Sequence, residues 1–184
     1  MTKFDLLLVG GRVVDPLNKL DEHVDVGIAD GKIKEVRSGI DRRTADKIVD
    51  LKGKTAIPGV IDSHMHADRA GYRMMAKAGV VTGVDFGDRM DIVCDNVKAY
   101  GSGMNVAALT NVRAYGTAPG TEIERSEIEK IVKRALEDGA IGVKITGGHN
   151  PLTPETTRNI IAVANQQRAY VAFHVGTTAT GSNL

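Results

Sequence analysis

The sequence predicts an α/β fold in which a small β-sheet unit precedes a series of parallel strand–helix steps. Short apolar runs separated by turn signals fill residues 1 to about 56. From Ile57 onward, strand and helix patterns alternate. The 21 glycines and the 4% aromatic content are typical of many tight turns between such elements. We therefore expect two domains, residues 1–56 and residues 57–184.

The composition excludes several classes of protein. With 42% hydrophobic and 26% charged residues, the chain has enough apolar side chains to bury a core. A net charge of +1 gives no reason to expect nucleic acid or a membrane surface as a partner. No apolar run reaches the ~18 residues of a membrane span, and the first residues do not form a convincing signal peptide. The lone Cys94 excludes an intrachain disulfide and fits a reducing compartment, so we expect a cytoplasmic protein.

The first domain reads as repeated strand–turn–strand segments. Asp30-Gly31 lies between two apolar runs and predicts a hairpin, because glycine accepts a positive φ. The tract Ser38–Ala45 predicts a solvated loop. The expected strands are Phe4–Val9, Arg12–Val14, Val24–Ile28, Ile33–Val36, Lys47–Leu51 and Thr55–Ile57.

The second domain reads as strands that are apolar on both faces, as parallel strands covered by helices should be. The expected strands are Val60–His64, Val81–Phe86, Val106–Val112, Ile141–Ile145 and Tyr170–Val175. Ser126–Glu129 has the pattern of a capping box, Gly139 marks a helix end, and Thr153-Pro154 marks a helix start. Shorter helices are expected at Tyr72–Ala78 and Asp91–Tyr100. Five successive steps predict a parallel architecture with right-handed crossovers.

Two histidines close the first of these strands. His64 and His66 are one residue apart in the stretch IPGVIDSHMHA. Because side chains alternate along a strand, both imidazoles leave the same face, about 6–7 Å apart at Cα. That spacing lets two nitrogen donors converge on one metal ion. Taken alone, the pair also fits a solvated or a core position.

Lys144 and His174 lie in two further strands. Desolvation of Lys144 inside an apolar strand lowers its pKa, and the free amine can react with carbon dioxide to give a carbamate that bridges two metals. The alternative is a snorkelling or ion-paired lysine. His174 closes the fifth strand, where a satisfied core histidine is the alternative. In a (β/α) barrel, functional side chains come from the carboxyl ends of different strands, so these residues can meet.

Three further residues are weaker candidates. His149, on the loop after the fourth strand, either contacts substrate or is a surface histidine. Asp62 and Asp85 either support ligand histidines through hydrogen bonds or are ordinary turn or strand-end carboxylates.

Five stretches together resemble the metal-dependent amidohydrolase superfamily, in particular its dihydroorotase, hydantoinase and N-acyl-amino-acid deacetylase branch. They are FDLLLVGGRVVDP with VDVGIADGKIKEV, GKTAIPGVIDSHMHAD, AGVVTGVDFGD, GAIGVKI and VAFHVG. The resemblance implies the N-terminal part of a (β/α)8 TIM-type barrel, with about five βα units, preceded by a small β-sandwich segment.

The resemblance also implies a binuclear metal centre. His64 and His66 are expected on one metal, the carboxylated Lys144 as a catalytic bridge, and His174 on the second metal. A hydroxide between two cations attacks the amide carbonyl of a small-molecule substrate, either a cyclic amide or an N-acyl amino acid. Two zinc ions are expected, with manganese, iron or nickel as alternatives. The same scaffold also supports deamination, but a lysine in the fourth strand argues against it.

The chain departs from the family pattern in two ways. The family also uses a histidine after the sixth strand and an aspartate after the eighth, whereas this chain ends at Leu184, just after the fifth expected strand. A complete barrel typically needs ~250 residues. We therefore expect a second chain that completes the barrel, in an oligomer. A truncated fragment or a non-catalytic structural or regulatory subunit are the alternatives. Asp68 stands where dihydroorotases have a substrate-binding arginine, and Arg69 follows it, which counts against that activity.

Overall fold

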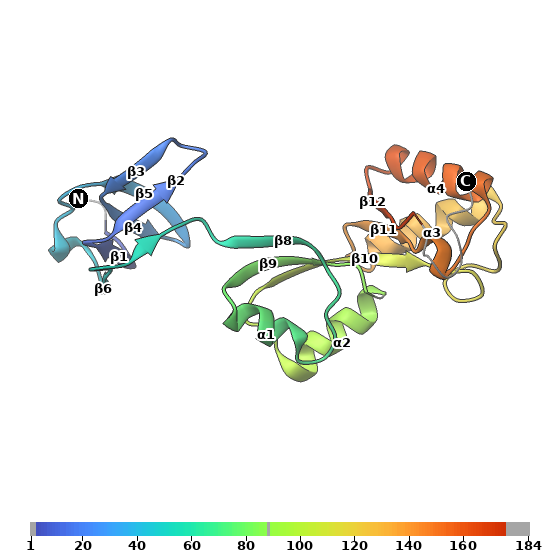
Figure 1. Cartoon of the computed structure of the whole chain (residues 1–184), viewed down its shortest axis with the longest axis horizontal. Helices are drawn as coiled ribbons and strands as arrows, with labels where there is room; N and C mark the ends of the chain where they lie inside the picture. The colour runs from blue at the N-terminus through green and yellow to red at the C-terminus, as the bar shows by residue number, and fades with distance from the viewer. Residues whose placement is uncertain (1–2, 88, 176–184) are drawn as a thin grey trace. The chain divides into compact units, whose positions relative to one another are not determined.

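The computed structural model describes residues 3–87 and 89–175. The chain divides into two compact units, Met1–Pro58 and Gly59–Leu184 (Figure 1). None of the described helices has the length and apolar character needed to cross a membrane.

The N-terminal unit consists of two small sheets. One has the order β5-β4-β1-β6 and the other the order β3-β2-β7. β1 is antiparallel to β4 and parallel to β6, while β2 is antiparallel to β3 and parallel to β7. The strands are β1 (Leu6–Val9), β2 (Arg12–Asp15), β3 (Leu20–His23), β4 (Asp25–Ala29), β5 (Lys32–Arg37), β6 (Ile48–Asp50) and β7 (Thr55–Ala56).

The core of this unit forms around Phe4, which is 2% exposed and packs with Leu7, Val9 and other apolar residues. Gly27 makes room for its ring, because a Cβ at that position would lie 2.6 Å from the Phe4 Cε1. The predicted hairpin at Asp30-Gly31 is confirmed, with φ values of 52° and 67° between β4 and β5. β3 was not predicted, because its sequence LDEH is polar and mostly exposed.

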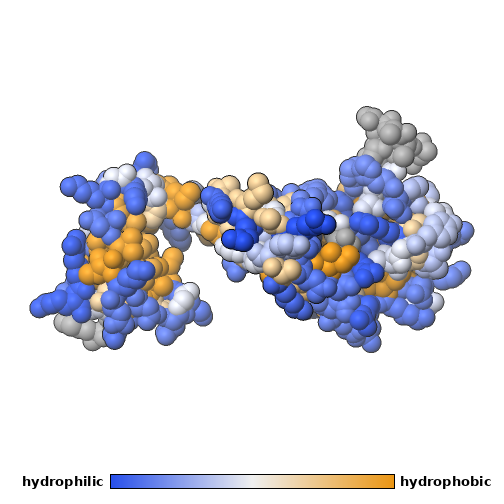
Figure 2. All heavy atoms as spheres, turned by 90° about the horizontal axis from the view of Figure 1, so that it is seen from below, coloured by the Kyte–Doolittle hydropathy of each residue, from blue (hydrophilic) through white to orange (hydrophobic). Residues whose placement is uncertain are grey.

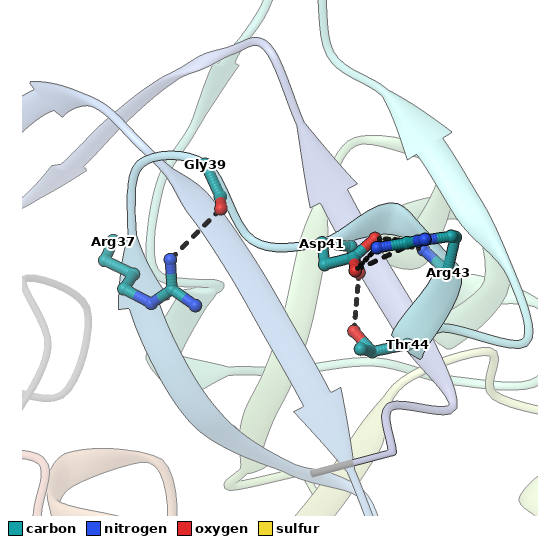
Figure 3. Close-up of polar contacts among 5 residues, drawn as sticks. All are labelled: Arg37, Gly39, Asp41, Arg43 and Thr44. Atoms are coloured by element: carbon teal, nitrogen blue, oxygen red, sulfur yellow. Dashed lines mark hydrogen bonds and ion pairs between the residues drawn. The ribbon is translucent and has the colours of Figure 1, made fainter. Parts of the chain in front are cut away.

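The tract predicted as a solvated loop contains a short 3₁₀ helix, η1 (Arg42–Thr44). Asp41 caps it by accepting hydrogen bonds from the Arg43 backbone N–H at 3.0 Å and from the Arg43 guanidinium. The Thr44 hydroxyl donates to the Asp41 carbonyl oxygen at 2.6 Å, and the Arg37 guanidinium donates to the Gly39 carbonyl oxygen at 3.1 Å (Figure 3). These local contacts give the loop its shape. Figure 2 shows apolar side chains gathered on the visible face of the N-terminal unit.

The second unit contains a five-stranded sheet with the order β12-β11-β10-β9-β8, in which every neighbouring pair is parallel. Each strand lies beside the one before it in sequence, without the reversal of order that marks a doubly wound sheet. The predicted parallel α/β architecture is confirmed. The strands are β8 (Val60–Met65), β9 (Val80–Asp85), β10 (Asn105–Val112), β11 (Gly142–Ile145) and β12 (Tyr170–Phe173).

Four helices alternate with these strands: α1 (Gly71–Lys77), α2 (Met90–Tyr100), α3 (Arg125–Glu137) and α4 (Pro154–Gln166). Figure 1 shows α1 and α2 side by side beneath β8, β9 and β10. The predicted N-cap at Thr153 is confirmed, since its hydroxyl accepts from the Thr156 N–H at 3.2 Å. The capping box at Ser126 is wrong. The N-cap of helix α3 lies two residues earlier, at Glu124, which makes no side-chain capping bond.

The two faces of the sheet differ in what covers them. Ala108 and Val112 belong to core clusters that face the helices. Leu109 belongs to a separate small cluster with Phe86 and Ala172. Because side chains alternate along β10, Leu109 and Asn111 point to the face away from the helices. We call this the inner face.

Candidate functional site

The histidine pair lies at the carboxyl end of β8. Met65 between them is 4% exposed and packs against Tyr72 and Val93 of the helices, so both imidazoles leave the opposite, inner face. Their ring centroids are 5.3 Å apart. Partial burial lowers the pKa of His64, and the positive charges of Lys144, His66 and His174 act in the same direction. The neutral form, which is the metal-binding form, is therefore favoured.

Phe86 is the common neighbour of the site residues. It follows β9 and is 3% exposed. Its ring centroid lies 4.2 Å from that of His64 and 6.3 Å from that of His66. The Lys144 amine lies 4.9 Å from the same ring centroid. From the sequence alone, Phe86 was predicted only as the end of a strand. Its position between Asp85 and Gly87, at the carboxyl end of a parallel strand, was the available signal.

Lys144 lies in β11 and is 2% exposed. Among the described residues, no carboxylate lies within ion-pairing distance of it. The ion-paired alternative therefore does not hold within the described part of the chain. Burial lowers its pKa. A desolvated cation–π contact of this kind stabilises the charged form by about 2 kcal/mol, which offsets only part of the cost of burying an unpaired cation.

His174 and His149 form a second pair. His174 follows β12, and its backbone N–H donates to the Ile145 carbonyl oxygen at 2.9 Å. Its ring lies 4.8 Å from that of His149, which belongs to the 3₁₀ helix η2 (Gly147–His149). Lys144 lies in β11, which is the neighbour of β12 in the same sheet as β8. The carboxyl-end side of this one sheet therefore carries five candidate residues: His64, His66, Lys144, His149 and His174.

These residues make up two histidine pairs and a lysine rather than one compact cluster. Within residues 3–87 and 89–175, no three His, Cys, Asp or Glu side chains lie close enough to hold a metal ion. The pair His64 and His66 supplies two imidazole nitrogens, and a third donor has to come from Lys144 as a carbamate or from outside the described residues. Imidazole and carboxylate-type ligands together fit a divalent ion such as zinc.

The two aspartates have other partners. The Tyr72 hydroxyl donates to Asp85 at 2.5 Å, and the Gly87 N–H donates to its other oxygen at 2.6 Å. Asp62 accepts from the backbone N–H of His64 at 3.1 Å. Both carboxylates thus hold strand ends in place, which is the ordinary interpretation of the two. Burial and the Asp85 carboxylate raise the pKa of the fully buried Tyr72.

A pocket of about 240 Å³ opens beside the histidines. It is lined by His66, Phe86, Gly87, Asn111, Arg113, Thr146, His149 and Asn150. Asn111 and Arg113 were not among the residues predicted from the sequence. Both lie at the carboxyl end of β10, where a polar residue in an apolar run was the available signal.

Comparison with known proteins gives a consistent picture. Residues 47–118 match the amidohydrolase family. A dihydroorotase of Geobacter metallireducens is 27% identical over 92% of this chain and 42% of its own length. Among solved structures, the N-acyl-D-glutamate deacylase of Bordetella bronchiseptica, complexed with zinc, has a TM-score of 0.71 and 20% identity over 95% of this chain and 46% of its own. An L-hydantoinase of Arthrobacter aurescens has a TM-score of 0.68 and 18% identity over 94% and 41%.

The three relatives match this chain over similar lengths. The chain spans less than half the length of these relatives, while they cover more than nine tenths of it. Its fold is that of the N-terminal part of their (β/α)8 barrels, with the β-sandwich segment that precedes the barrel.

Proposed function

Because this chain belongs to the metal-dependent amidohydrolase superfamily and corresponds to its N-terminal portion, we propose that it supplies part of the active site of a hydrolase that cleaves amide C–N bonds. The substrate is a cyclic amide or an N-acyl amino acid. The observation that carries the proposal is Lys144, a buried amine without an ionic partner, on the face of the sheet from which His64 and His66 project.

In this proposal His64 and His66 would hold one divalent metal ion, His174 would hold a second, and the carbamate of Lys144 would be a further ligand, with zinc as the first choice of metal. When bound, the two ions would supply Lewis-acid activation of a water and of the amide carbonyl. His149, on the rim of the pocket, contacts the substrate.

The residues of this chain prepare that site. Burial lowers the pKa of the Lys144 amine, which favours its neutral form. A neutral amine attacks carbon dioxide, a C–N bond forms, and one proton leaves the nitrogen, which gives the anionic carbamate. Phe86 covers the amine on one side with an apolar ring, so water is excluded there. The lowered pKa of His64 keeps its nitrogen lone pair available.

Further polypeptide completes the barrel in this proposal. Ile61 of the edge strand β8 is 65% exposed, and Tyr170 and Phe173 of the edge strand β12 are 55% and 42% exposed. Apolar side chains on unpaired edge strands promote association, and the relatives continue beyond the matched part. We place the completed protein in the cytoplasm, because its described portion has a single, unpaired cysteine, Cys94.

The experiment compares the barrel-completed protein with its Lys144→Met variant, supplied with ¹³C-labelled bicarbonate. We expect a carbamate carbon signal and about two metal ions per site in the unaltered protein. In the variant we expect no such signal, less metal, and activity on N-acyl and cyclic amides lower by ~10³-fold or more. Lys133→Met, on the exposed surface of α3, is the matched control. Undiminished metal content and activity in the Lys144 variant contradict the assignment.

A further inference from the structure

We infer that Phe86 is a positioning residue whose ring holds the His64 imidazole in one plane and leaves the His66 imidazole free to turn. One imidazole of the pair is then preset for a metal ion, and the other adjusts to it. This division of roles rests on the proposed function in taking the two histidines as metal ligands. It is set by an aromatic side chain that follows a different strand, β9.

Hydrogen bonds to other parts of the protein do not orient the two imidazoles. The backbone N–H of His64 donates to Asp62 at 3.1 Å, but within residues 3–87 and 89–175 no group forms a hydrogen bond with the ring of either histidine. Both His64 and His66 are exposed residues. Metal-binding histidines are usually oriented by a hydrogen bond from their second ring nitrogen to a carboxylate or a carbonyl. In the described part of this chain, packing takes the place of that bond.

Phe86 contacts the two imidazoles unequally. The ring centroids of Phe86 and His64 are 4.2 Å apart with 30° between the planes, so the rings are nearly stacked. The final torsion of a histidine side chain is otherwise broad, but turning the His64 ring out of this plane would push its edge into the phenyl ring. For His66 the centroid distance is 6.3 Å and the interplanar angle is 84°. This more distant, edge-to-face contact leaves room for rotation.

Phe86 can act as a support because its own position is fixed. Its backbone N–H donates at 2.9 Å to the carbonyl oxygen of Met65, the residue between the two histidines. Its ring is 3% exposed and packs with Leu109 and Ala172 on the inner face. The backbone contact and the packing together hold the phenyl ring beside the carboxyl end of β8.

The residues on both sides of Phe86 are fixed as well. The Asp85 carboxylate accepts from the Tyr72 hydroxyl through one oxygen and from the Gly87 N–H through the other. A Cβ at position 87 would lie 2.8 Å from the Asp85 Oδ1, so a glycine permits this close contact. The chain on either side of the phenyl ring is therefore tied to one buried carboxylate, which limits movement of the ring.

The test is NMR of the full chain with labelled histidine, in the presence of a chelator that removes metal. In the unaltered chain we expect the His64 ring protons to be shifted upfield by the phenyl ring and to show one side-chain orientation, whereas His66 is averaged over several. In Phe86→Leu, which keeps an apolar side chain without the flat ring, we expect His64 to lose this shift and to become averaged like His66. Phe4→Leu replaces an equally buried ring in the other unit and is expected to leave both histidines unchanged.

Zinc binding by the barrel-completed protein is the second measurement. We expect Phe86→Leu to weaken zinc binding by ~10-fold or more, as when a group that orients a metal ligand is removed. Phe4→Leu is expected to keep the affinity. A general loss of packing would disturb both histidines alike, so a change confined to His64 distinguishes positioning from a purely structural role.

Three results overturn the inference: equal shifts and equal averaging of His64 and His66 in the unaltered chain, a His64 ring that keeps one orientation in Phe86→Leu, or an undiminished zinc affinity in that variant. The first needs no substitution, so it remains decisive if the variant does not fold. Because the NMR measurements are made without metal, they are independent of the carbamate and metal measurements on Lys144. An unaltered protein that binds no zinc contradicts the proposed function, while NMR still decides whether Phe86 fixes the His64 ring.

Discussion

The two units of the chain differ in whether their polar and charged side chains are exposed or buried. The N-terminal unit keeps its charged groups at the surface, in short-range pairs such as Arg12 with Asp21 and Arg43 with Asp41. In the part of the chain that the structure describes, every buried polar or charged side chain belongs to the second unit: Asp85, Thr110, Asn111, Lys144 and Thr156. The difference indicates that the N-terminal unit is a scaffold and that the second unit carries the chemistry.

Within the second unit, the partners of the buried groups separate structure from function. Asp85 accepts from Tyr72 and Gly87, and Thr156 accepts from the backbone N–H of Ile123 at 3.0 Å. These two groups are satisfied and hold the fold together. Lys144 has no ionic partner, and the Asn111 Oδ1 has no hydrogen-bond partner, among the described residues. Groups buried at a cost without compensation are expected where a ligand or a modification completes them.

The strongest test of the scaffold interpretation is Phe4→Ala. The ring is 2% exposed, so its removal leaves a cavity, and we expect a loss of about 3–5 kcal/mol in the stability of the N-terminal unit. Hydrogen exchange of the Leu7 and Val26 amides is expected to accelerate, while the Leu109 and Val143 amides keep their protection. Ile33→Ala, at a position 67% exposed, is the control and should change stability by about 0.5 kcal/mol or less. Equal acceleration in both units would mean that they do not unfold separately.

In the second unit, Tyr72→Phe tests whether the hydrogen bonds of a buried carboxylate stabilise the fold. It removes one donor from the buried Asp85 carboxylate and leaves only the Gly87 N–H. Hydrogen bonds to charged groups contribute about 1.5–3 kcal/mol, so we expect the second unit to lose about 2 kcal/mol in denaturant unfolding. Tyr100→Phe, at a half-exposed position, is the matched control. An unchanged free energy of unfolding in Tyr72→Phe would show that the hydroxyl does not stabilise the Asp85 carboxylate.

The smallest expected effect is a pH dependence confined to the N-terminal unit. The Arg43 guanidinium beside Asp41 lowers the pKa of that carboxyl from 3.8 to about 2. Because the folded pKa lies below the unfolded value, this stabilisation is complete above about pH 4 and is lost as the pH falls towards 2. Since the pair is exposed, the effect is small and weakens with salt.

An NMR titration of the Asp41 carboxyl checks this expectation directly. In Arg43→Gln the pKa of Asp41 is expected to return towards 3.8, because its main cause has been removed. An unchanged titration in that variant would assign the low pKa to the backbone N–H of residue 43 instead.

Local chemistry made much of the fold predictable. Positive φ at Asp30 and Gly31, and the capping hydroxyl of Thr153, are decided by neighbouring atoms in the chain, and both predictions are confirmed. Where local preferences were weak, prediction was wrong or incomplete. The capping box at Ser126 does not form, and the polar strand β3, which pairs with the preceding strand β2, lacks the apolar alternation that would have predicted it.

The candidate site shows the same division. The alternation of a strand fixed the shared face of His64 and His66, and the apolar surroundings of Lys144 in sequence predicted its burial. The contacts of Phe86, Asn111 and Arg113 are made with residues far away in the chain, so their positions at strand ends were the only signal in the sequence.

By itself, the sequence determined most of the strands and helices, the parallel second unit and the resemblance to a superfamily, because these follow from periodicity, turn residues and local motifs. Only the tertiary structure decided which polar groups are buried, which of them have partners, and that the Gly87 carbonyl joins Asn111 to Arg113. The physical reason is that burial and hydrogen bonding depend on what lies nearby in space, and pairing between β9 and β10 brings together residues more than twenty positions apart.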